Sequence, residues 1–557
     1  MFTLRFQENH IHSNFSDGIF SLKEIFEYNH FHDKLDLTLT DHVDKNTRWF
    51  KKYEIKIKML RKQYTDFSVK IGCEVKIIDE SGELNTTKEI LQAAEVVIGS
   101  VHHFPGIKNM SEKELMKKEY ELTKILAKNK SIHILGHPFS MGKRFYESNP
   151  PLSHVEEVYR LCVKNKIKFE YSKKRAPDNV KKFVCQQISR GKIDHFSFGS
   201  DVHDSLPEIG ESAFDVAPRL NVLITGAGAG VGQSIIKSVK LSKLKTHIVP
   251  ADGNFMAAGL YTGNSSYVIP MNNEKNFISE IISICKREKI NYIFAGTDVE
   301  LEVLSRNKKI IESKTSADLI ISSMKPILIA DDKWKTVEFL KKHNFPYAKS
   351  FLKKDVTKAM EKLPFPMVVK PRVGARSIGF SIVKNEKELR EKLNEIHNPI
   401  IQEYLSEDNE EFTCGSFFFK GKNYGVITAR RWLRNGDTYK AVFHHDKQLE
   451  KFIARVGKKL DIYGPCNFQL RKTSKGPVIF EINCRFSGTS GAASFLGFNP
   501  ANAIMQKLSF GRPLKTLSYK ESYMFRYWNE IFTPLPEVKK VQKDGKIQSP
   551  KSEKNIF

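Results

Sequence analysis

A regular series of histidines and acidic residues constrains the fold of this chain more than any other feature of its sequence. The members stand at the ends of short apolar, β-branched runs, 28 to 35 residues apart: His10, His42, Glu74, His102, His137, Glu170 and Asp201. Charged, helix-like stretches separate the runs. A step of this length is the size of one strand–helix unit, and such units build a parallel sheet or barrel. We therefore expect residues 1–210 to form a barrel of parallel strands.

Strand ends that converge can bring distant side chains into one site. In a parallel barrel the C-terminal ends of all strands meet at one mouth. Imidazoles and carboxylates suit Zn²⁺, Mn²⁺ or Fe²⁺, and Glu74 could bridge two cations. A metal cluster generates hydroxide near neutral pH and stabilises the oxygens of a phosphoryl displacement, so the pattern predicts phosphate-ester hydrolysis. Eight polar residues have the required positions: His10, His12, His42, Glu74, His102, His137, Asp201 and His203.

Short motifs around these residues resemble a known family. The motifs HxHxxxSDG, TDH, SxH, GHP and GSDxH together resemble the PHP (polymerase and histidinol phosphatase) family. The resemblance covers residues 1 to about 205 and implies a distorted (β/α)7 barrel that holds two to three Zn²⁺, Mn²⁺ or Fe²⁺ ions. We also expect Asp201 to act in catalysis.

The same resemblance divides the ligands into three sets. They are His10, His12, Glu74 and Asp201; then Glu74, His102 and His137; then Asp17, His42 and His203. Asp17 stands where some family members carry a histidine. Glu170 could support the ligands from behind or face the substrate, and the sequence leaves both roles open.

A second α/β region begins near Leu220. The run NVLITGAGAGVGQSIIKSV (221–239) predicts a strand, a glycine-rich turn and a helix, an order in which backbone amides can bind phosphate. An acid follows the next strand in VPAD (249–252), where a ribose-binding residue would stand. Similar turns also open folds that bind no phosphate, so a dinucleotide site stays open. We expect a Rossmann-like domain over residues 219–325.

The next segment predicts a triphosphate pocket. In PMVVKPRVGARSIGF (366–380), Lys370 ends an apolar strand and precedes a glycine-containing loop. Backbone amides of such a loop can cover phosphates, and the lysine can neutralise them. Arg376, Ser377 and Gly379 belong to this loop and therefore to the expected nucleotide site.

Polar groups on later strand-like segments could hold the rest of a nucleotide. In IIQEYL (400–405), Glu403 and the backbone of Tyr404 and Leu405 could bind an adenine edge, and Glu411 could meet ribose hydroxyls. Oxygen ligands suit Mg²⁺ bound to ATP phosphates. An arginine can stabilise the transferring phosphoryl group. The remaining candidates for these two roles are Gln469, Glu481, Asn483 and Arg485.

In this order, the segments resemble the ATP-grasp superfamily, most closely its carbamoyl phosphate synthetase large-subunit and amino-acid ligase branch. The resemblance covers roughly residues 220–515 and includes GAGAGVGQ, YVIP and GTDVEL, which match the domain that precedes ATP-grasp. It implies an α+β fold over residues 326–532 and a flexible lid at 372–380. Lys333 and Lys370 would bind phosphate, Glu403 and Leu405 adenine. The Mg²⁺ (or Mn²⁺) ligands would be Gln469, Glu481 and Asn483.

Composition limits the partners. The chain carries 90 Lys and Arg against 64 Asp and Glu, but no nucleic-acid recognition motif accompanies this charge, so we expect no nucleic-acid partner. No apolar run approaches the length of a membrane helix, and no secretory signal is recognisable, which predicts a cytoplasmic protein without a membrane partner. Residues 533–557 are lysine-rich and poor in large apolar residues, so we expect a basic flexible tail.

Together these features predict a bifunctional enzyme, in which an ATP-dependent ligase joins a small-molecule carboxylate to an amine or thiol through an acyl phosphate. The barrel would hydrolyse a phosphorylated metabolite. Two alternatives stay open: the barrel is a non-catalytic structural or regulatory metal-binding module, or the chain binds nucleic acid through its charge. A homo-oligomer is compatible with all three.

Overall fold

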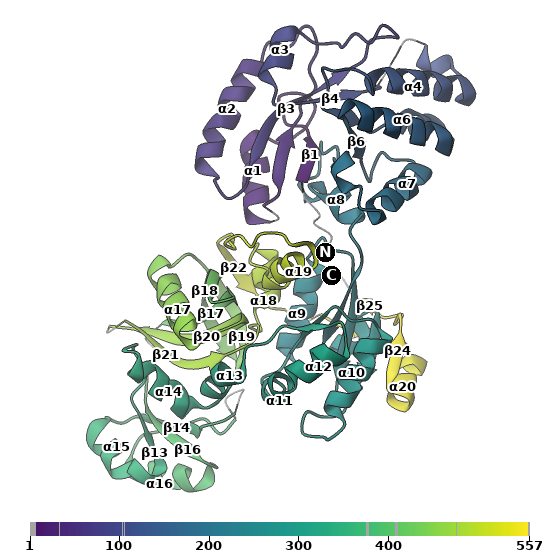
Figure 1. Cartoon of the computed structure of the whole chain (residues 1–557). Helices are drawn as coiled ribbons and strands as arrows, with labels where there is room; N and C mark the ends of the chain where they lie inside the picture. Colours follow the sequence, from purple (N-terminus) through teal and green to yellow (C-terminus); the bar gives the residue numbers. More distant parts are fainter. Residues whose placement is uncertain are drawn as a thin grey trace. The chain divides into compact units, whose positions relative to one another are not determined.

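A computed structural model describes residues 7–32, 34–102, 104, 106–374, 378–406, 410–474, 476–527 and 529–554 (Figure 1). The chain divides into two compact units. The N-terminal unit is Met1–Pro218 with Lys243–Lys245 and Ser509–Arg512, and the C-terminal unit is the remainder. Within the described residues, we find no helix with the length and apolar character needed to cross a lipid bilayer.

The N-terminal unit is built on seven parallel strands that follow one another in chain order. The first and last strands approach each other: Ile11 forms a parallel bridge with Val202, and the His12 N–H donates to the Val202 carbonyl at 2.9 Å. The sheet is therefore curved nearly into a barrel. The strands are β1 (Gln7–Ile11), β2 (Asp36–Leu39), β3 (Val69–Lys76), β4 (Val96–Ser100), β5 (Ile134–Gly136), β6 (Lys168–Tyr171) and β7 (Phe196–Phe198).

Helices alternate with these strands. Ser21 caps the first helix and Ser111 caps the fourth, each in a capping box with a glutamate three residues later, so short polar signals set where both helices begin. The helices are α1 (Leu22–Phe31), α2 (Phe50–Gln63), α3 (Lys88–Ala93), α4 (Glu112–Leu126), α5 (Ser140–Tyr146), α6 (Leu152–Asn165), α7 (Asp178–Ser189) and α8 (Glu211–Asp215).

The C-terminal unit opens with a six-stranded sheet of order β12-β11-β8-β9-β10-β24. Its strands are parallel except the last, which pairs antiparallel with β10. The strands are β8 (Leu220–Ile224), β9 (Thr246–Asp252), β10 (Ser265–Val268), β11 (Tyr292–Phe294), β12 (Asp318–Leu319) and β24 (Lys546–Gln548). The helices of this part are α9 (Gly230–Lys240), α10 (Phe277–Arg287), α11 (Leu301–Arg306) and α12 (Lys308–Lys314).

Two antiparallel sheets follow. A four-stranded sheet of order β13-β16-β14-β15 contains β13 (Ser350–Leu352), β14 (Met367–Pro371), β15 (Ser381–Val383) and β16 (Pro399–Glu403). A six-stranded sheet of order β21-β20-β17-β18-β19-β22 contains β17 (Glu410–Phe419), β18 (Lys422–Arg434), β19 (Asp437–Phe443), β20 (Gly464–Thr473), β21 (Gly476–Asn483) and β22 (Ser522–Phe525). The helices are α13 (Met324–Asp331), α14 (Lys333–Lys342), α15 (Val356–Lys362), α16 (Glu386–Glu395), α17 (Lys447–Leu460), α18 (Ser490–Phe495) and α19 (Pro500–Phe510).

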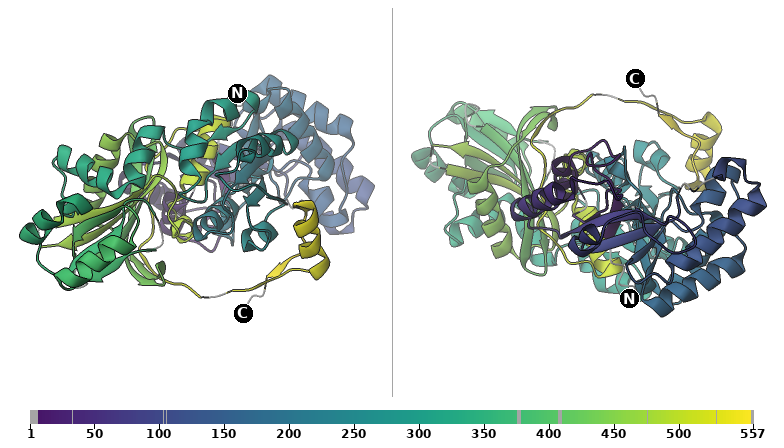
Figure 2. Two further views of the ribbon diagram at one scale, coloured as in Figure 1. Left: turned by 90° about the horizontal axis from the view of Figure 1, so that it is seen from below. Right: turned by 90° about the horizontal axis from the view of Figure 1, so that it is seen from above.

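The C-terminal segment corrects the expectation of a flexible tail. It forms α20 (Leu535–Asp544) and β24, the yellow elements at the C-terminal end of the chain in Figures 1 and 2. In addition, β23 (Ile531–Phe532) pairs with β25 (Glu553–Lys554). Val541 and Ile547 are buried against Leu260 and Tyr261. The composition argument failed because a few apolar residues on one helix face, together with backbone pairing to β10, are sufficient to order the segment.

Candidate functional site

The mouth of the N-terminal unit gathers the predicted metal ligands around Glu74, whose side chain is fully buried at the end of β3. The two carboxylate oxygens face different histidines. Oε1 lies 2.8 Å from His102 Nε2 and 3.1 Å from His137 Nε2. Oε2 lies 3.3 Å from His10 Nε2, 3.5 Å from His12 Nε2 and 2.9 Å from His42 Nδ1. This arrangement suits a carboxylate that bridges two cations.

A second carboxylate, Asp201, lies beside two of the histidines that face Glu74 Oε2. Its Oδ1 lies 3.3 Å from His12 Nε2 and 3.7 Å from His10 Nε2. The ligand atoms of these three residues all lie within 4.8 Å of one another, and the same holds for His10, Glu74 and His137.

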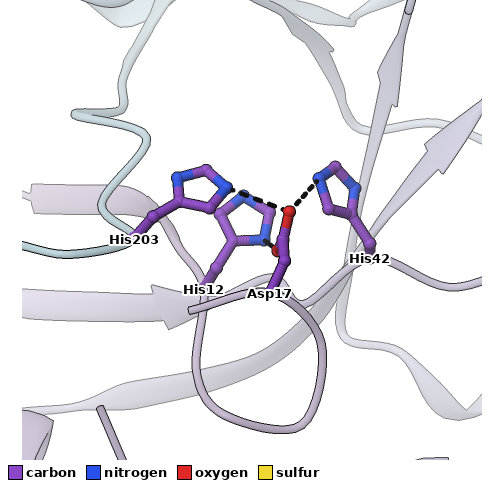
Figure 3. Close-up of side chains that lie close together, drawn as sticks. All are labelled: His12, Asp17, His42 and His203. Atoms are coloured by element: carbon purple, nitrogen blue, oxygen red, sulfur yellow. Dashed lines mark ion pairs between the residues drawn. The ribbon is translucent and has the colours of Figure 1, made fainter. Parts of the chain in front are cut away.

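Asp17 forms the centre of the third group, with His12, His42 and His203 around it (Figure 3). Its Oδ2 lies 3.4 Å from His203 Nε2 and 3.5 Å from His42 Nε2, and its Oδ1 lies 3.6 Å from His12 Nδ1. Unlike Glu74 and Asp201, the Asp17 side chain is 54% exposed. The structure thus brings together every ligand that the sequence predicted at this mouth.

Hydrogen bonds behind the ligands orient the imidazole rings. His10 Nδ1 lies 3.0 Å from Glu170, His137 Nδ1 lies 3.1 Å from Ser140 Oγ, and His203 Nδ1 lies 2.9 Å from the Asp201 carbonyl. A ring whose Nδ1 donates to such an acceptor presents an unprotonated Nε2 to a metal. Glu170 is buried and also accepts the His137 backbone N–H at 2.7 Å. The sequence left two roles open for Glu170, and these contacts favour the first, in which it orients the ligand residues through hydrogen bonds.

Burial controls the charge of these groups. It lowers the pKa of His102 to about 4 and also lowers the pKa of His12, so both rings are neutral at neutral pH, as metal ligands must be. Burial alone would raise the pKa of Glu74, but the imidazoles around it, first His102, hold that pKa well below its usual range. His12 and His102 are thus neutral imidazoles, whereas, against the effect of burial, nearby carboxylates raise the pKa of His10, His137 and His203.

The polar atoms at the mouth fit divalent cations. The buried atoms His10 Nε2, His12 Nε2, His42 Nδ1 and Glu74 Oε2 have no hydrogen-bond partner in the described part of the chain. An unsatisfied buried polar group costs about 1–3 kcal/mol, which metal coordination would remove. The donor set of nitrogens and carboxylates suits Zn²⁺, Mn²⁺ or Fe²⁺.

Sequence reasoning missed Arg175 at this mouth. The residue follows β6 in the segment SKKRAP, and its Nε donates to Asp201 Oδ2. Its side chain is 33% exposed. The segment lies at the same strand end as the ligands, and that position could have identified it.

The C-terminal unit holds a pocket of about 280 Å³ between its two antiparallel sheets. Apolar side chains such as Val368, Ile382 and Phe480 form part of its wall. Gly379 stands between two further lining residues, Ile378 and Phe380. Arg376 and Ser377 lie outside the described residues. The predicted nucleotide-site residues that line the pocket are Lys333, Lys370, Glu403, Tyr404, Leu405, Glu411, Gln469 and Glu481.

Lys370 is the most buried cation of the pocket, with 7% exposure. Burial, aided by the nearby Lys333, lowers its pKa to about 8. Lys333 donates through Nζ to the Gly374 carbonyl at 2.8 Å, which places both lysines at the start of the 372–380 loop. Within the described residues this ammonium faces the Phe480 ring and has no ion pair, which suits a polyanionic ligand.

The acidic and amide groups form a connected network. Glu411 accepts from Arg431 and Arg471 at 2.8 Å each, and Arg431 also donates to Gln469 Oε1 at 2.8 Å. Glu481 accepts from Asn483 Nδ2 at 2.9 Å, so the predicted Mg²⁺ ligands are neighbours.

Glu403 and Arg485 have partners outside that network. Glu403 Oε1 accepts the Lys349 backbone N–H at 2.8 Å. Arg485 does not line the pocket; its Nη2 contacts Asp298 Oδ2 at 2.7 Å.

The glycine-rich turn after β8 is filled by the protein itself. The Gly228 N–H donates to Asp252 Oδ2 at 2.7 Å, where a dinucleotide phosphate would have to bind. A Cβ on Gly226 would lie 2.4 Å from Thr297 Cγ2, and one on Gly259 would lie 2.1 Å from the Ala227 carbonyl. Gly226 in the turn and Gly259 outside it thus serve close packing, and the Gly228 amide is already bound by Asp252, which does not favour a dinucleotide phosphate at this amide.

Two family models match parts of the C-terminal unit. The model described as ATP-grasp domain matches residues 330–489, and that described as PylC-like, N-terminal domain matches residues 222–317. The chain therefore contains an ATP-grasp domain that follows a PylC-like N-terminal domain.

Among relatives, the carbamoyl phosphate synthase large chain of Clostridium acetobutylicum is 21% identical over 341 residues, 56% of this chain and 31% of that protein. This chain thus spans about a third of the length of that relative. A probable phosphatase of Thermoanaerobacter sp. is 23% identical over 194 residues, 34% of this chain and 72% of that protein. The structure of N5-carboxyaminoimidazole synthetase from Staphylococcus aureus with ADP aligns with a TM-score of 0.44 and 16% identity, covering 58% of this chain and 85% of that one.

Proposed function

We propose that the C-terminal unit is an ATP-dependent ligase that joins a small-molecule carboxylate to an amine or thiol. One observation carries the proposal: a single pocket collects the buried cation Lys370, the second cation Lys333 and the oxygen ligands Gln469 and Glu481. The ATP-grasp match over residues 330–489 and the similarity to carbamoyl phosphate synthase support it. We propose that the C-terminal unit consists of a Rossmann-like domain followed in the chain by an α+β ATP-grasp domain.

Each group has a defined task in this proposal. Lys370 and Lys333 neutralise the ATP phosphates, and the backbone of Tyr404 and Leu405 holds the adenine edge. Gln469, Glu481 and Asn483 would hold Mg²⁺ or Mn²⁺, which offsets the phosphate charge. The role of Arg485 at the transferring phosphoryl group stays a prediction, because this residue contacts Asp298 and does not line the pocket.

The reaction proceeds in two displacements. A carboxylate oxygen attacks the γ-phosphorus, and ADP leaves. The amine or thiol then attacks the acyl carbon, the C–O bond to the phosphate breaks, and inorganic phosphate leaves. The lid expected at 372–380, of which residues 375–377 lie outside the described residues, would keep water from the acyl phosphate.

Trapping of the acyl phosphate tests the ligase. Purified protein is incubated with Mg-ATP, hydroxylamine and pools of amino acids and small carboxylic acids, and hydroxamates are identified by mass spectrometry. We expect ADP and one hydroxamate. Lys370→Met should abolish both, whereas Lys335→Met, on an exposed lysine of α14, should leave both unchanged. ADP release with no hydroxamate from any pool would argue against an acyl phosphate.

For the N-terminal unit we propose a metal-dependent phosphoesterase on a distorted (β/α)7 barrel. Residues that would hold two to three Zn²⁺, Mn²⁺ or Fe²⁺ ions cluster at one mouth, and the similarity to a probable phosphatase supports the assignment. Such ions would supply a hydroxide near neutral pH and neutralise the phosphoryl oxygens. The chain itself contributes Arg175, whose Nε is held by Asp201 and whose outer nitrogens can bind a substrate phosphate.

Phosphate release from a panel of phosphomonoesters tests this assignment, with metal content measured in parallel. Asp201→Asn should lose metal and activity together, and Asp194→Asn, an exposed aspartate of the same unit, should keep both. A wild-type protein that binds metal but hydrolyses no ester would favour the alternative of a non-catalytic metal-binding module.

A further inference from the structure

Asp41 connects the strand end after β2 to the loop that carries Asp17. It is fully buried and directly precedes His42. Its Oδ1 accepts the backbone N–H of Ser13 at 2.8 Å, the backbone N–H of Ser16 at 3.1 Å and Ser16 Oγ at 2.7 Å. Its Oδ2 accepts Ser13 Oγ at 2.8 Å. One carboxylate therefore binds four donors from two residues of a single loop.

The loop between β1 and α1 has little freedom once it is anchored in this way. The Ser16 and Gly18 backbone N–H groups both donate to the Ser13 carbonyl at 3.1 Å. A Cβ on Gly18 would lie 2.4 Å from the His12 carbonyl oxygen, so this position requires glycine. Ser16 Oγ also lies 3.2 Å from Asp17 Oδ1. The motif SDG thus supplies one anchoring residue, one metal-facing carboxylate and one residue that packs against a ligand.

Asp17 depends on this anchor more than the other ligand carboxylates depend on their surroundings. Glu74 ends a buried strand and Asp201 is 4% exposed, whereas Asp17 lies on a loop with 54% of its side chain exposed. If the loop were not anchored, fixing this exposed side chain in the position that coordinates a metal would cost conformational entropy.

We propose that Asp41 is a positioning residue that preorganises Asp17, and thereby sets the affinity of the metal held by Asp17, His42 and His203. This inference rests on the proposed metal centre of the barrel. It identifies Asp41 as the residue that anchors the most exposed ligand, Asp17. The other two sets are built on strand ends around Glu74, and His12, which directly precedes this loop and also lies near Asp17, connects the first of them to it. The metal at the Asp17 set should therefore be the first to leave.

Stepwise Mn²⁺ binding tests the proposal. The full chain, without nucleotide, is titrated with Mn²⁺ alone, free Mn²⁺ is counted by electron paramagnetic resonance, and the bound metal left after dialysis is measured by mass spectrometry. Loss of a group that orients a metal ligand costs typically about 10- to 100-fold in affinity. We expect Asp41→Ala and Ser16→Ala to weaken one Mn²⁺ by that factor and to leave the tighter ions unchanged. Asp41→Asn, which keeps the shape but removes the charge, should show a smaller loss.

Ser21→Ala is the matched control because Ser21 ends the same loop, and within the described residues its hydroxyl hydrogen-bonds to Glu24 rather than to Asp41 or Asp17. It should bind Mn²⁺ as the wild type does. If Asp41→Ala does not fold, Ser16→Ala is used to test the proposal. Wild-type affinity for every ion in Ser16→Ala and Asp41→Asn would overturn the inference, as would equal weakening of all ions. A wild type that binds no Mn²⁺ at the barrel would instead overturn the proposed metal centre.

Discussion

Replacement of Lys370 by methionine should stabilise the protein while it removes ATP binding. The pKa of Lys370 falls from 10.5 to about 8, first because of burial and then because of Lys333. Below pH 8 Lys370 is protonated in both states, and its ammonium group is less favourable in the folded state, where it is buried. The two values differ by about 2.5, and each pKa unit corresponds to about 1.4 kcal/mol, so the charge costs about 3 kcal/mol at pH 7. The cost disappears as the pH rises from about 8 to 10.5, because the unfolded state then binds the extra proton.

Chemical unfolding of wild type and Lys370→Met without nucleotide measures this cost. At pH 7 the variant should be more stable by up to about 3 kcal/mol, and the difference should narrow by pH 10. Mg-ATP should raise the unfolding midpoint of the wild type only. Lys335→Met, on an exposed lysine of α14, controls for loss of net charge. A Lys370→Met protein that is less stable at pH 7, or that ATP still stabilises, would refute the reasoning.

Three further predictions concern other parts of the chain. Arg175→Ala should reduce kcat/KM for a phosphomonoester by about 10-fold or more, since a charge-assisted hydrogen bond to phosphate contributes about 1.5–3 kcal/mol. Because Arg175 also donates to Asp201, the rates are compared per bound metal ion, and equal rates would contradict a contact with the substrate phosphate. Val541→Asp places a charge in the buried contact with Leu260 and Tyr261, so limited proteolysis should release the segment after residue 530, whereas cleavage at the wild-type rate would contradict its packing. Burial raises the pKa of Glu300 to about 7, above its usual 4.5, so wild-type stability should fall as the pH rises between these values. Because Glu8 and Glu119 are shifted in the same way, Glu300→Gln should reduce that slope by the contribution of one group, as pH-dependent unfolding would show.

The sequence predicted which side chains lie at the barrel mouth because the spacing of these residues equals the length of one strand–helix unit. His10, Glu74 and Asp201 lie far apart in the chain, but a parallel strand order forces their strand ends together. Arg175 escaped prediction because its contact with Asp201 crosses from one strand end to the next, and an arginine in SKKRAP has no periodic partner.

The C-terminal unit shows the limits of local patterns. The glycine-rich turn after β8 has the composition of a phosphate-binding loop, but its Gly228 amide binds Asp252, a tertiary contact that no local pattern reveals. Similarly, the ion pairs of Glu411 with Arg431 and Arg471 depend on the register of three antiparallel strands. The order of the C-terminal segment depends on pairing between β10 and β24, nearly 300 residues apart in the chain.

Transfer of an oxygen isotope tests the central claim, ligation through an acyl phosphate, most directly. The carboxylic acid identified by hydroxamate formation is labelled with ¹⁸O in its carboxylate and incubated with Mg-ATP and its amine or thiol partner. The account predicts that each turnover releases ADP and a phosphate that carries one ¹⁸O, because the C–O bond of the acyl phosphate breaks in the second displacement. Unlabelled phosphate, or release of AMP and pyrophosphate, would contradict it.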